Sequence, residues 1–546
     1  MKNLLYLSSV IFLLTSCIKS KKADLIVRNA TIYTVDDGFT TGQAMAIKDG
    51  KILEIGSENG ILNKYRYDEV FDAQTKPIYP GFIDAHCHFL GYGLSLQQVN
   101  LVGTKSFEEV LERVIEFSKT NAGEWIEGRG WDQNDWEIQE FPTKEKLDEL
   151  FPNRPVYIRR IDGHAALANS EALKRANITT ETEITGGIIE QKDGKLTGIL
   201  VDNALEIVKR VIPKPNEEQL TKALLDAQKD CFAVGLTTVD DAGLDKRHVE
   251  LIDKLQKDSL LFMKVYAMLT DNEENLNHYL KNGPYKTEML NVRSFKFYGD
   301  GALGSRGACL LAPYADVTDS SHYGFLLNTE TYYRESAQKL FDAGFQMNTH
   351  CIGDSANRLF LNIYGSVLPE GNDKRWRIEH CQVVDKSDME SFRKYGIIPS
   401  IQPTHATSDM YWADERLGNE RVKNAYSYQE LKNQLGFLAL GTDFPIESID
   451  PLKTFYAAVV REDLTGYPEG GYQMKNALTR TEALMGITIW AAMSNFEELE
   501  KGSLEVGKSA DFIVLQKDIL KVSNEELKNN KVIATFINGK QVFPTK

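Results

Sequence analysis

The sequence predicts an α/β fold: a (β/α)₈ barrel of the TIM type, with a small β-sandwich domain built from both termini and an inserted subdomain after the first barrel strand. Three observations predict it. Both ends of the chain have strand patterns, the middle repeats a helix, a glycine and an apolar strand, and a polar residue often follows that strand. Eight strands alternating with helices are typical of this barrel.

The repeated unit in the middle of the chain is punctuated by glycine, the residue that most often follows a helix C-terminus. We expect helices at 218–234, 331–343, 387–395 and 428–435, each followed by a glycine. The strands predicted for the barrel are 81–88, 236–239, 261–268, 293–299, 345–349, 375–380, 397–403 and 437–442. In such a barrel the active site lies at the C-terminal ends of the strands.

The two ends of the chain predict one composite β domain, from residues 24–79 and 490–546, around a barrel at 80–489. Asp49-Gly50 and Asn538-Gly539 each separate two apolar runs, which is a strong hairpin signal.

More than a hundred residues separate the first predicted strand from the next barrel helix, far more than a normal connection needs. We therefore expect residues 100–215 to form an inserted, partly β subdomain over the barrel mouth. Whether it supplies substrate contacts or only elaborates the structure stays open.

The N-terminus predicts an export signal. Residues 1–16 combine a lysine, an apolar run and small residues, and Leu14-Thr15-Ser16-Cys17 resembles a bacterial lipobox. Cys17 would then be lipidated, and residues 17–23 would tether the protein to a bacterial membrane, on its periplasmic or cell-surface side. Ordinary cleavage and secretion is the alternative.

The net charge bears on which partners the protein could bind, and the cysteine content bears on disulfides. With 63 basic and 78 acidic residues the net charge is −15, which argues against nucleic acid or an anionic membrane surface as a partner. Five cysteines remain after Cys17, an odd and sparse set that does not predict disulfides. Cys87, Cys351 and Cys381 each follow a histidine and are expected to be buried free thiols.

Polar residues at the predicted strand ends form the candidate site. They are His86, His88, Lys296, His350, His380 and Asp443. Alternation along a strand turns both histidines of His86-Cys87-His88 to one side. Imidazoles and a carboxylate suit zinc and similar divalent ions. A lysine among them is unexpected unless it is carbamylated, which converts it to a carboxylate.

Three motifs carry a family resemblance. Residues 80–88, Pro-Gly-Phe-Ile-Asp-Ala-His-Cys-His, match the opening motif of the amidohydrolase superfamily, and residues 501–512 resemble its closing motif. Residues 297–308 and 350–354 resemble the subgroup called amidohydrolase family 3, which includes YtcJ-like and N-substituted formamide deformylase-like proteins. The resemblance covers nearly the whole chain and is poor for substrate.

The resemblance implies a metal centre. His86 and His88 would hold one ion with Asp443, and His350 and His380 would hold a second, with a carbamylated Lys296 between. Zn²⁺ is the expected metal, as one ion or two. Asp443 would also be general base and then protonate the leaving nitrogen, which makes Asp443, Lys296 and His380 the predicted catalytic residues.

Four further residues are predicted substrate contacts. Asp300 and Arg306 lie in a glycine-rich loop after the fourth strand, with a structural Asp–Arg pair as the alternative. His405 follows the seventh strand, and His164 lies in the insertion.

The expected function is hydrolysis of an amide-like C–N bond in a small molecule. Hydrolysis of an ester or lactone at the same site is the alternative, and so is a non-catalytic binding lipoprotein. A homodimer is possible.

Overall fold

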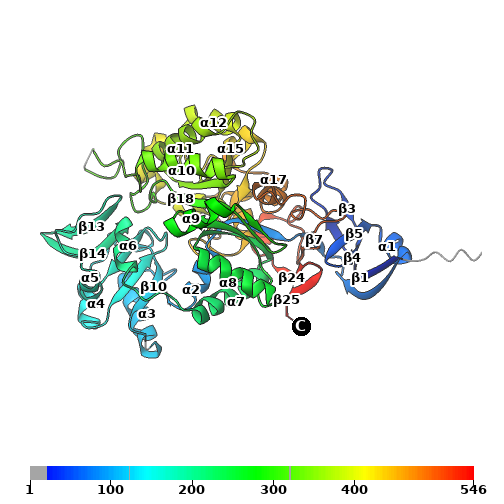
Figure 1. The fold of residues 1–546 in the computed structure, drawn as a ribbon, viewed down its shortest axis with the longest axis horizontal. Coiled ribbons are helices and arrows are strands. Elements are labelled where there is room, and N and C mark those ends of the chain that lie inside the picture. Colours follow the sequence, from blue (N-terminus) through cyan, green and yellow to red (C-terminus); the bar gives the residue numbers. More distant parts are fainter. Residues whose placement is uncertain (1–20, 122, 319–320, 546) are drawn as a thin grey trace, which may run out of the picture.

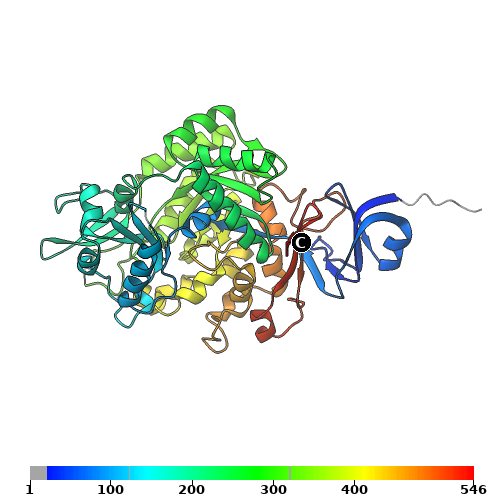
Figure 2. The same ribbon diagram turned by 90° about the horizontal axis from the view of Figure 1, so that it is seen from below.

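The computed structural model describes residues 21–121, 123–318 and 321–545. The predicted signal peptide and Cys17 lie outside these residues. Three parts follow one another along the molecule: the inserted subdomain at one end, the barrel in the middle and the β domain at the other end (Figures 1 and 2).

The centre is the predicted barrel, a sheet in which eight strands pair in parallel. In pairing order they are β8 (Phe82–Cys87), β15 (Leu236–Leu244), β16 (Lys264–Thr270), β18 (Leu290–Tyr298), β19 (Gln346–Cys351), β20 (Arg377–His380), β21 (Ile398–Ile401) and β22 (Ala439–Leu440). The predicted fold class is confirmed.

The seam between β8 and β22 is closed by polar contacts. The Asp443 backbone N–H donates to His86 O at 2.7 Å, and the Thr442 N–H and hydroxyl donate to the Asp84 carboxylate at 2.9 and 2.7 Å. A Cβ at Gly441 would lie 2.6 Å from His86 N, so only glycine allows this approach. The seam therefore places His86 and Asp443 side by side.

Helices surround the barrel (Figures 1 and 2). The main ones are α2 (Phe89–Ser95), α7 (Glu217–Ala233), α8 (Lys246–Lys257), α9 (Glu273–Asn282), α10 (Glu330–Ala343), α11 (Asp354–Val367), α12 (Met389–Tyr395), α13 (Pro403–Asp409), α14 (Ala413–Arg421), α15 (Tyr428–Leu435), α16 (Pro451–Val460) and α17 (Arg480–Gly486). The four predicted helices are present with ends shifted by at most two residues. Gly344, Gly396 and Gly436 are their left-handed C-caps, with φ of 78°, 61° and 88°.

The β domain contains two sheets. The first is N-terminal, in the order β5 (Lys51–Gly56), β4 (Ala44–Lys48), β1 (Lys21–Arg28), β6 (Tyr65–Asp72). The second joins both ends of the chain, in the order β25 (Lys540–Phe543), β24 (Val532–Ile537), β23 (Phe512–Leu515), β7 (Pro77–Pro80), β2 (Thr31–Tyr33), β3 (Thr41–Gly42). Both predicted hairpins are present, as β4–β5 and β24–β25.

The structure differs from the predicted boundaries at two places. Residues 21–23, expected in the tether, form the start of β1 and pair with β6. Helix α18 (Ile489–Ser494), expected in the β domain, packs against the barrel, because Ala491 and Ala492 cluster with Ile83 and Ala439.

The inserted subdomain is built on a six-stranded mixed sheet. Its order is β13 (Gly187–Lys192), β14 (Lys195–Asp202), β12 (Ala165–Ala168), β11 (Val156–Arg160), β10 (Ile126–Trp131), β9 (Val99–Asn100). Helices α3 (Phe107–Thr120), α4 (Glu145–Leu150), α5 (Ser170–Arg175) and α6 (Asn203–Lys209) complete it. Two separate apolar clusters, one containing Trp131 and the other Trp125, give it its own core.

Two expectations concern the cysteines and the relation of the chain to a membrane. The cysteines described are all free, and Cys87, Cys351 and Cys381 are buried as predicted. In the part of the chain that the structure describes, no helix has the length and apolarity to cross a membrane.

Candidate active site

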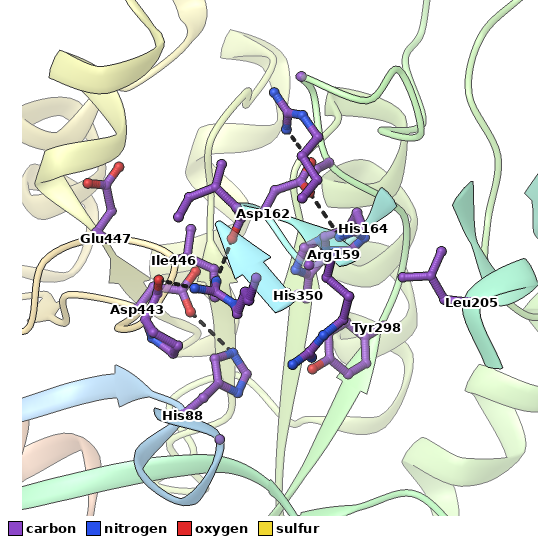
Figure 3. A pocket seen from close by; sticks show the side chains of 18 of the residues that line it. His88, Arg159, Asp162, His164, Leu205, Tyr298, His350, Asp443, Ile446 and Glu447 are labelled. Atoms are coloured by element: carbon purple, nitrogen blue, oxygen red, sulfur yellow. Dashed lines mark hydrogen bonds and ion pairs between the residues drawn. The ribbon is translucent and has the colours of Figure 1, made fainter. Parts of the chain in front are cut away.

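The C-terminal ends of the barrel strands open into a cavity of about 1500 Å³ that the inserted subdomain also lines. Its walls include His88, Lys296, His350, His380, His405 and Asp443 from the barrel, and Arg129, Arg159, Asp162, His164 and Leu205 from the insertion. Figure 3 shows His88, His350 and Asp443 facing Arg159, Asp162 and His164 across the cavity. His86 is completely buried beneath it.

Three histidines are held by acceptors at their Nδ1 atoms. His86 Nδ1 lies 2.6 Å from Glu379 Oε2, His88 Nδ1 lies 3.0 Å from the Ala242 carbonyl, and His380 Nδ1 lies 2.7 Å from Gln402 Oε1. Since a carboxylate and carbonyl oxygens only accept, each Nδ1 must carry the proton that it donates. In the neutral imidazoles, each Nε2 therefore presents a lone pair.

Ring nitrogens of three site histidines lie near Asp443. Its Oδ1 lies 3.2 Å from His88 Nε2 and 3.7 Å from His86 Nε2, and its Oδ2 lies 3.7 Å from His405 Nε2 (Figure 3). Asp443 Oδ1, His405 Nε2 and also His350 Nε2 are buried and make no aligned hydrogen bond among the described residues. A cation between them would satisfy such facing acceptors in a buried site.

Two sets of ligand atoms lie close enough to share an ion. Atoms of His86, His88 and Asp443 lie within 4.8 Å of one another, and so do atoms of His380, His405 and Asp443. The first set is the predicted one. The second contains His405, predicted as a substrate contact, in place of His350, whose ring centroid lies 4.6 Å from that of His380.

Burial keeps these groups in the form that binds a metal. It lowers the pKa of His86 to about 4, helped by the Lys296 charge, and lowers the pKa of His350 and His380 well below the usual value. Burial opposes ionisation of Asp443, but the contact with His88 outweighs it and holds the pKa of Asp443 well below the usual range. His86, His350 and His380 are thus neutral and Asp443 is ionised at pH 7.

Lys296 lies at the bottom of the same site. Its Nζ is 3.0 Å from His86 Nε2 and 4.8 Å from the centre of the Tyr298 ring. Burial lowers the pKa of Lys296 to about 8, against the opposing charges of Glu379 and Asp443. A substantial fraction of the amine is therefore neutral near pH 8.

A buried ion-pair network supports His86 from below. Arg377 donates to Glu379 Oε1 at 2.7 Å and to Asp240 Oδ2 at 2.9 Å, and all three side chains are fully buried. Burial favours the neutral acid at Glu379, but the Arg377 charge and the hydrogen bond from His86 hold the pKa of Glu379 well below the usual range. Sequence reasoning missed Glu379; the available signal was Arg377-Ile378-Glu379, two charges two residues apart on a predicted strand.

His164 reaches the cavity from the insertion. Its Nδ1 lies 2.6 Å from Asp202 Oδ1, and its ring centroid lies 5.1 Å from that of His350. Asp202 Oδ2 packs against the glycine-rich loop, where a Cβ at Gly301 or Gly307 would lie 2.5 or 2.4 Å from it. The glycines of this loop thus let the insertion approach the barrel.

Asp300 and Arg306 do not line the cavity. Asp300 is fully buried and accepts from the backbone N–H groups of Cys309, Ile352 and Gly353 at 2.8 to 2.9 Å. Arg306 pairs with Asp316 at 2.8 Å. Both therefore support the loop. Asp300 Oδ1 also lies 3.8 Å from His350 Nε2, and the two residues do not form the Asp–Arg pair considered as the alternative.

A barrel of this kind, with histidine and carboxylate side chains converging at its strand ends, defines the class of metal-dependent hydrolases. The chain belongs to the Amidohydrolase family, whose profile matches residues 69–543.

Relatives match along nearly the whole chain. Protein LONG AFTER FAR-RED 3 of Arabidopsis thaliana is 32% identical over 96% of this chain and 92% of its own. YtcJ of Bacillus subtilis strain 168 is 30% identical over 94% and 98%, and N-substituted formamide deformylase of Arthrobacter pascens is 26% identical over 94% and 97%. The crystal structure of an uncharacterized metal-dependent hydrolase from Pyrococcus horikoshii OT3 superposes with a TM-score of 0.75 at 29% identity, covering 92% of this chain and 99% of that one. The family resemblance predicted from the motifs is confirmed.

Proposed function

We propose that the protein hydrolyses an amide-like C–N bond of a small molecule at this strand-end site. The observation that carries the proposal is the set of three histidines whose Nδ1 protons are held by Glu379, Ala242 and Gln402, so that their Nε2 lone pairs face the site. Fixing the tautomer through a second partner is typical of metal-ligating histidine.

The residues fit one or two divalent ions, with zinc expected from the imidazole and carboxylate donors. His86, His88 and Asp443 would hold the first. His350, His380 and a carbamylated Lys296 would hold the second, with His405 as the competing ligand because its Nε2 lies beside Asp443. Metal content of His350→Ala and His405→Ala separates these two sets, since only the true ligand is needed for the second ion.

Carbamylation of Lys296 requires a neutral amine, which adds to carbon dioxide with loss of one proton and becomes an anionic carbamate. The lowered pKa of Lys296 favours that amine. Asn348, in register with Lys296 on the next strand, is buried and neither polar atom of its side chain has a partner among the described residues. A carbamate or a water molecule at this position would satisfy that amide.

The residues of the site would play different roles in the reaction. When bound, the metal supplies Lewis acidity toward water and the substrate carbonyl. Asp443 accepts the proton of the attacking water at a carboxylate oxygen and returns it to the leaving nitrogen. His380, held by Gln402, and the carbamylated Lys296 would hold an ion beside that carboxylate. His164, held by Asp202, faces the substrate from the insertion.

The test is turnover by metal-loaded protein on a panel of small amides, formamides, esters and lactones, with chelated protein as the control. Amide hydrolysis that is lost on chelation and restored by zinc supports the proposal. Turnover of esters or lactones alone favours the esterase alternative. Metal-loaded protein that binds small molecules but turns over none is a binding lipoprotein.

We also propose that the mature protein is exported and anchored to a bacterial membrane through a lipid on Cys17, as the lipobox-like sequence indicates. Membrane fractionation of the full chain and of Cys17→Ser tests it. The wild-type protein should sediment with membranes and the variant should not; equal distribution of the two contradicts the anchor.

The sequence analysis also left open a homodimer. Light scattering of the mature chain measures its molar mass and so tests whether it forms one.

A further inference from the structure

Two arginines from the insertion share one side of the cavity. Arg129 on β10 and Arg159 on β11 are direct partners in the parallel pairing of these strands, so their side chains project from the same face of the sheet. Both line the cavity, and in Figure 3 the side chain of Arg159 is drawn between those of His88 and Leu205, beside Tyr298.

Neither guanidinium has an acidic partner. Arg129 donates to the carbonyl oxygens of Pro445 and Ile161, and Arg159 donates to Gln98 Oε1 at 3.1 Å. Among the residues that the structure describes, no carboxylate lies within 4.0 Å of either one. The acidic groups that act on them from farther away are Glu127 for Arg159, and Asp443 and Asp162 for Arg129.

The next residue shows that this lack of acidic partners is selective. Arg160 is fully buried and contacts two carboxylates, Asp132 and, at 2.6 Å, Asp162. Arg160 also lines the cavity, so the insertion neutralises one of these three arginines at this wall. It leaves two adjacent like charges at the cavity wall, in a protein whose net charge is −15.

Two neighbouring guanidinium groups repel each other in a partly buried site, and an anion between or beside them relieves that cost. Arg159 is the more available of the two for binding an anion. Its guanidinium has five N–H donors, and the Gln98 side-chain oxygen accepts at only one edge of it. A planar fork of this kind matches a carboxylate with two parallel hydrogen bonds.

We propose that the cavity selects amides that carry a carboxylate, and that Arg159 binds this carboxylate while Arg129 adds to the positive potential and joins the insertion to the barrel through Pro445. The inference rests on the proposed function, because it names the substrate class of the same site.

The test uses matched pairs: N-acyl amino acids and the same compounds with the terminal carboxylate converted to a neutral carboxamide. For the zinc-loaded mature chain, both kcat/KM and the dissociation constant are measured for each member of a pair. Wild-type protein should favour the acid about 10- to 100-fold, the size expected for hydrogen bonds to a charged group. Arg159→Gln should reduce this ratio to near one with its metal content unchanged.

Arg66→Gln is the matched control, because Arg66 is an exposed residue of β6 in the β domain and its removal changes net charge equally. It should keep the wild-type ratio. Equal treatment of acid and carboxamide by the wild type, binding of neither, or an unchanged ratio in Arg159→Gln would overturn the proposal.

Binding and turnover separate this inference from the proposed function. If the acid binds more tightly through Arg159 and no pair is hydrolysed, the carboxylate site stands and the amidase assignment fails. If both members are hydrolysed at equal rates, the amidase assignment stands and the carboxylate site fails.

Discussion

The cavity has two walls that are built differently. On the barrel wall three ligating histidines are held by a second group, as His86 is by Glu379, which is in turn held by Arg377. On the insertion wall Arg129 and Arg159 are held only by carbonyl and amide oxygens. Reaction chemistry requires groups fixed to a fraction of an ångström, whereas recognition requires donors that remain available.

This difference suggests a division of labour: the barrel wall supplies metal ligands and proton transfer, and the insertion wall supplies selectivity. Substitutions on the barrel wall should therefore change metal content, rate and stability together. Substitutions on the insertion wall should change the choice of substrate.

The largest effect is expected for Asp443→Asn. The amide cannot take a proton from water, so kcat/KM should fall by about 10³-fold, within the range for loss of a general base. Steady-state kinetics with parallel elemental analysis measures it. A variant that keeps its metal and more than a tenth of the wild-type rate would assign the base elsewhere.

Glu379→Gln should weaken both metal binding and the fold. The amide leaves Arg377 with one fewer buried counter-charge and is a weaker acceptor than the carboxylate for the His86 Nδ1 proton, so metal affinity should drop about 10- to 100-fold and unfolding free energy by about 3–5 kcal/mol. Zinc titration and urea unfolding measure the two. Glu390→Gln, at an exposed ion pair with Arg393, is the control and should change neither.

The buried histidines predict a pH dependence of the metal-free protein. His86 has a folded pKa of about 4 against 6.5 when unfolded, so the unfolded chain binds more protons between these values and stability rises with pH across that window. Across this window His86 changes the free energy of unfolding by about 3 kcal/mol. Chelated His86→Asn should show a correspondingly flatter pH profile of unfolding free energy; parallel profiles would place this dependence on other groups.

The smallest effect is expected where the two walls meet. Gly301→Ala would place a Cβ 2.5 Å from Asp202 Oδ2, so the His164–Asp202 pair must shift. We expect a loss of about 1–3 kcal/mol of stability, with lower kcat/KM and unchanged metal content. Gly56→Ala, where the added Cβ meets nothing closer than 4.0 Å, is the control. Full activity of Gly301→Ala would remove His164 from the site.

The sequence predicted those parts of the molecule that local chemistry determines. Glycine after each helix, Asp-Gly and Asn-Gly hairpins and polar strand ends locate the barrel, the β domain and the histidines. These signals depend on backbone conformation within a few residues, and the structure has them where expected.

The sequence did not predict contacts that depend on how separate segments meet. Glu379 and its neighbour His380 both reach the site, although consecutive residues of a strand point to opposite faces, since His380 adopts a φ of 73° and leaves the strand pattern. Asp443, with a φ of 61°, also departs from extended geometry. The arginine pair depends on the register of β10 with β11, which no local pattern sets.

The most direct test of a metal-dependent hydrolase is the metal content of the chain made without its first 17 residues. Elemental analysis should be paired with native mass spectrometry, since acid removes carbon dioxide from a carbamate. We predict two divalent ions per chain and the added mass of one carbon dioxide, which Lys296→Ala abolishes. One ion with an unmodified Lys296 would indicate a mononuclear site. No metal, even after zinc is offered, would contradict the account and favour the binding lipoprotein.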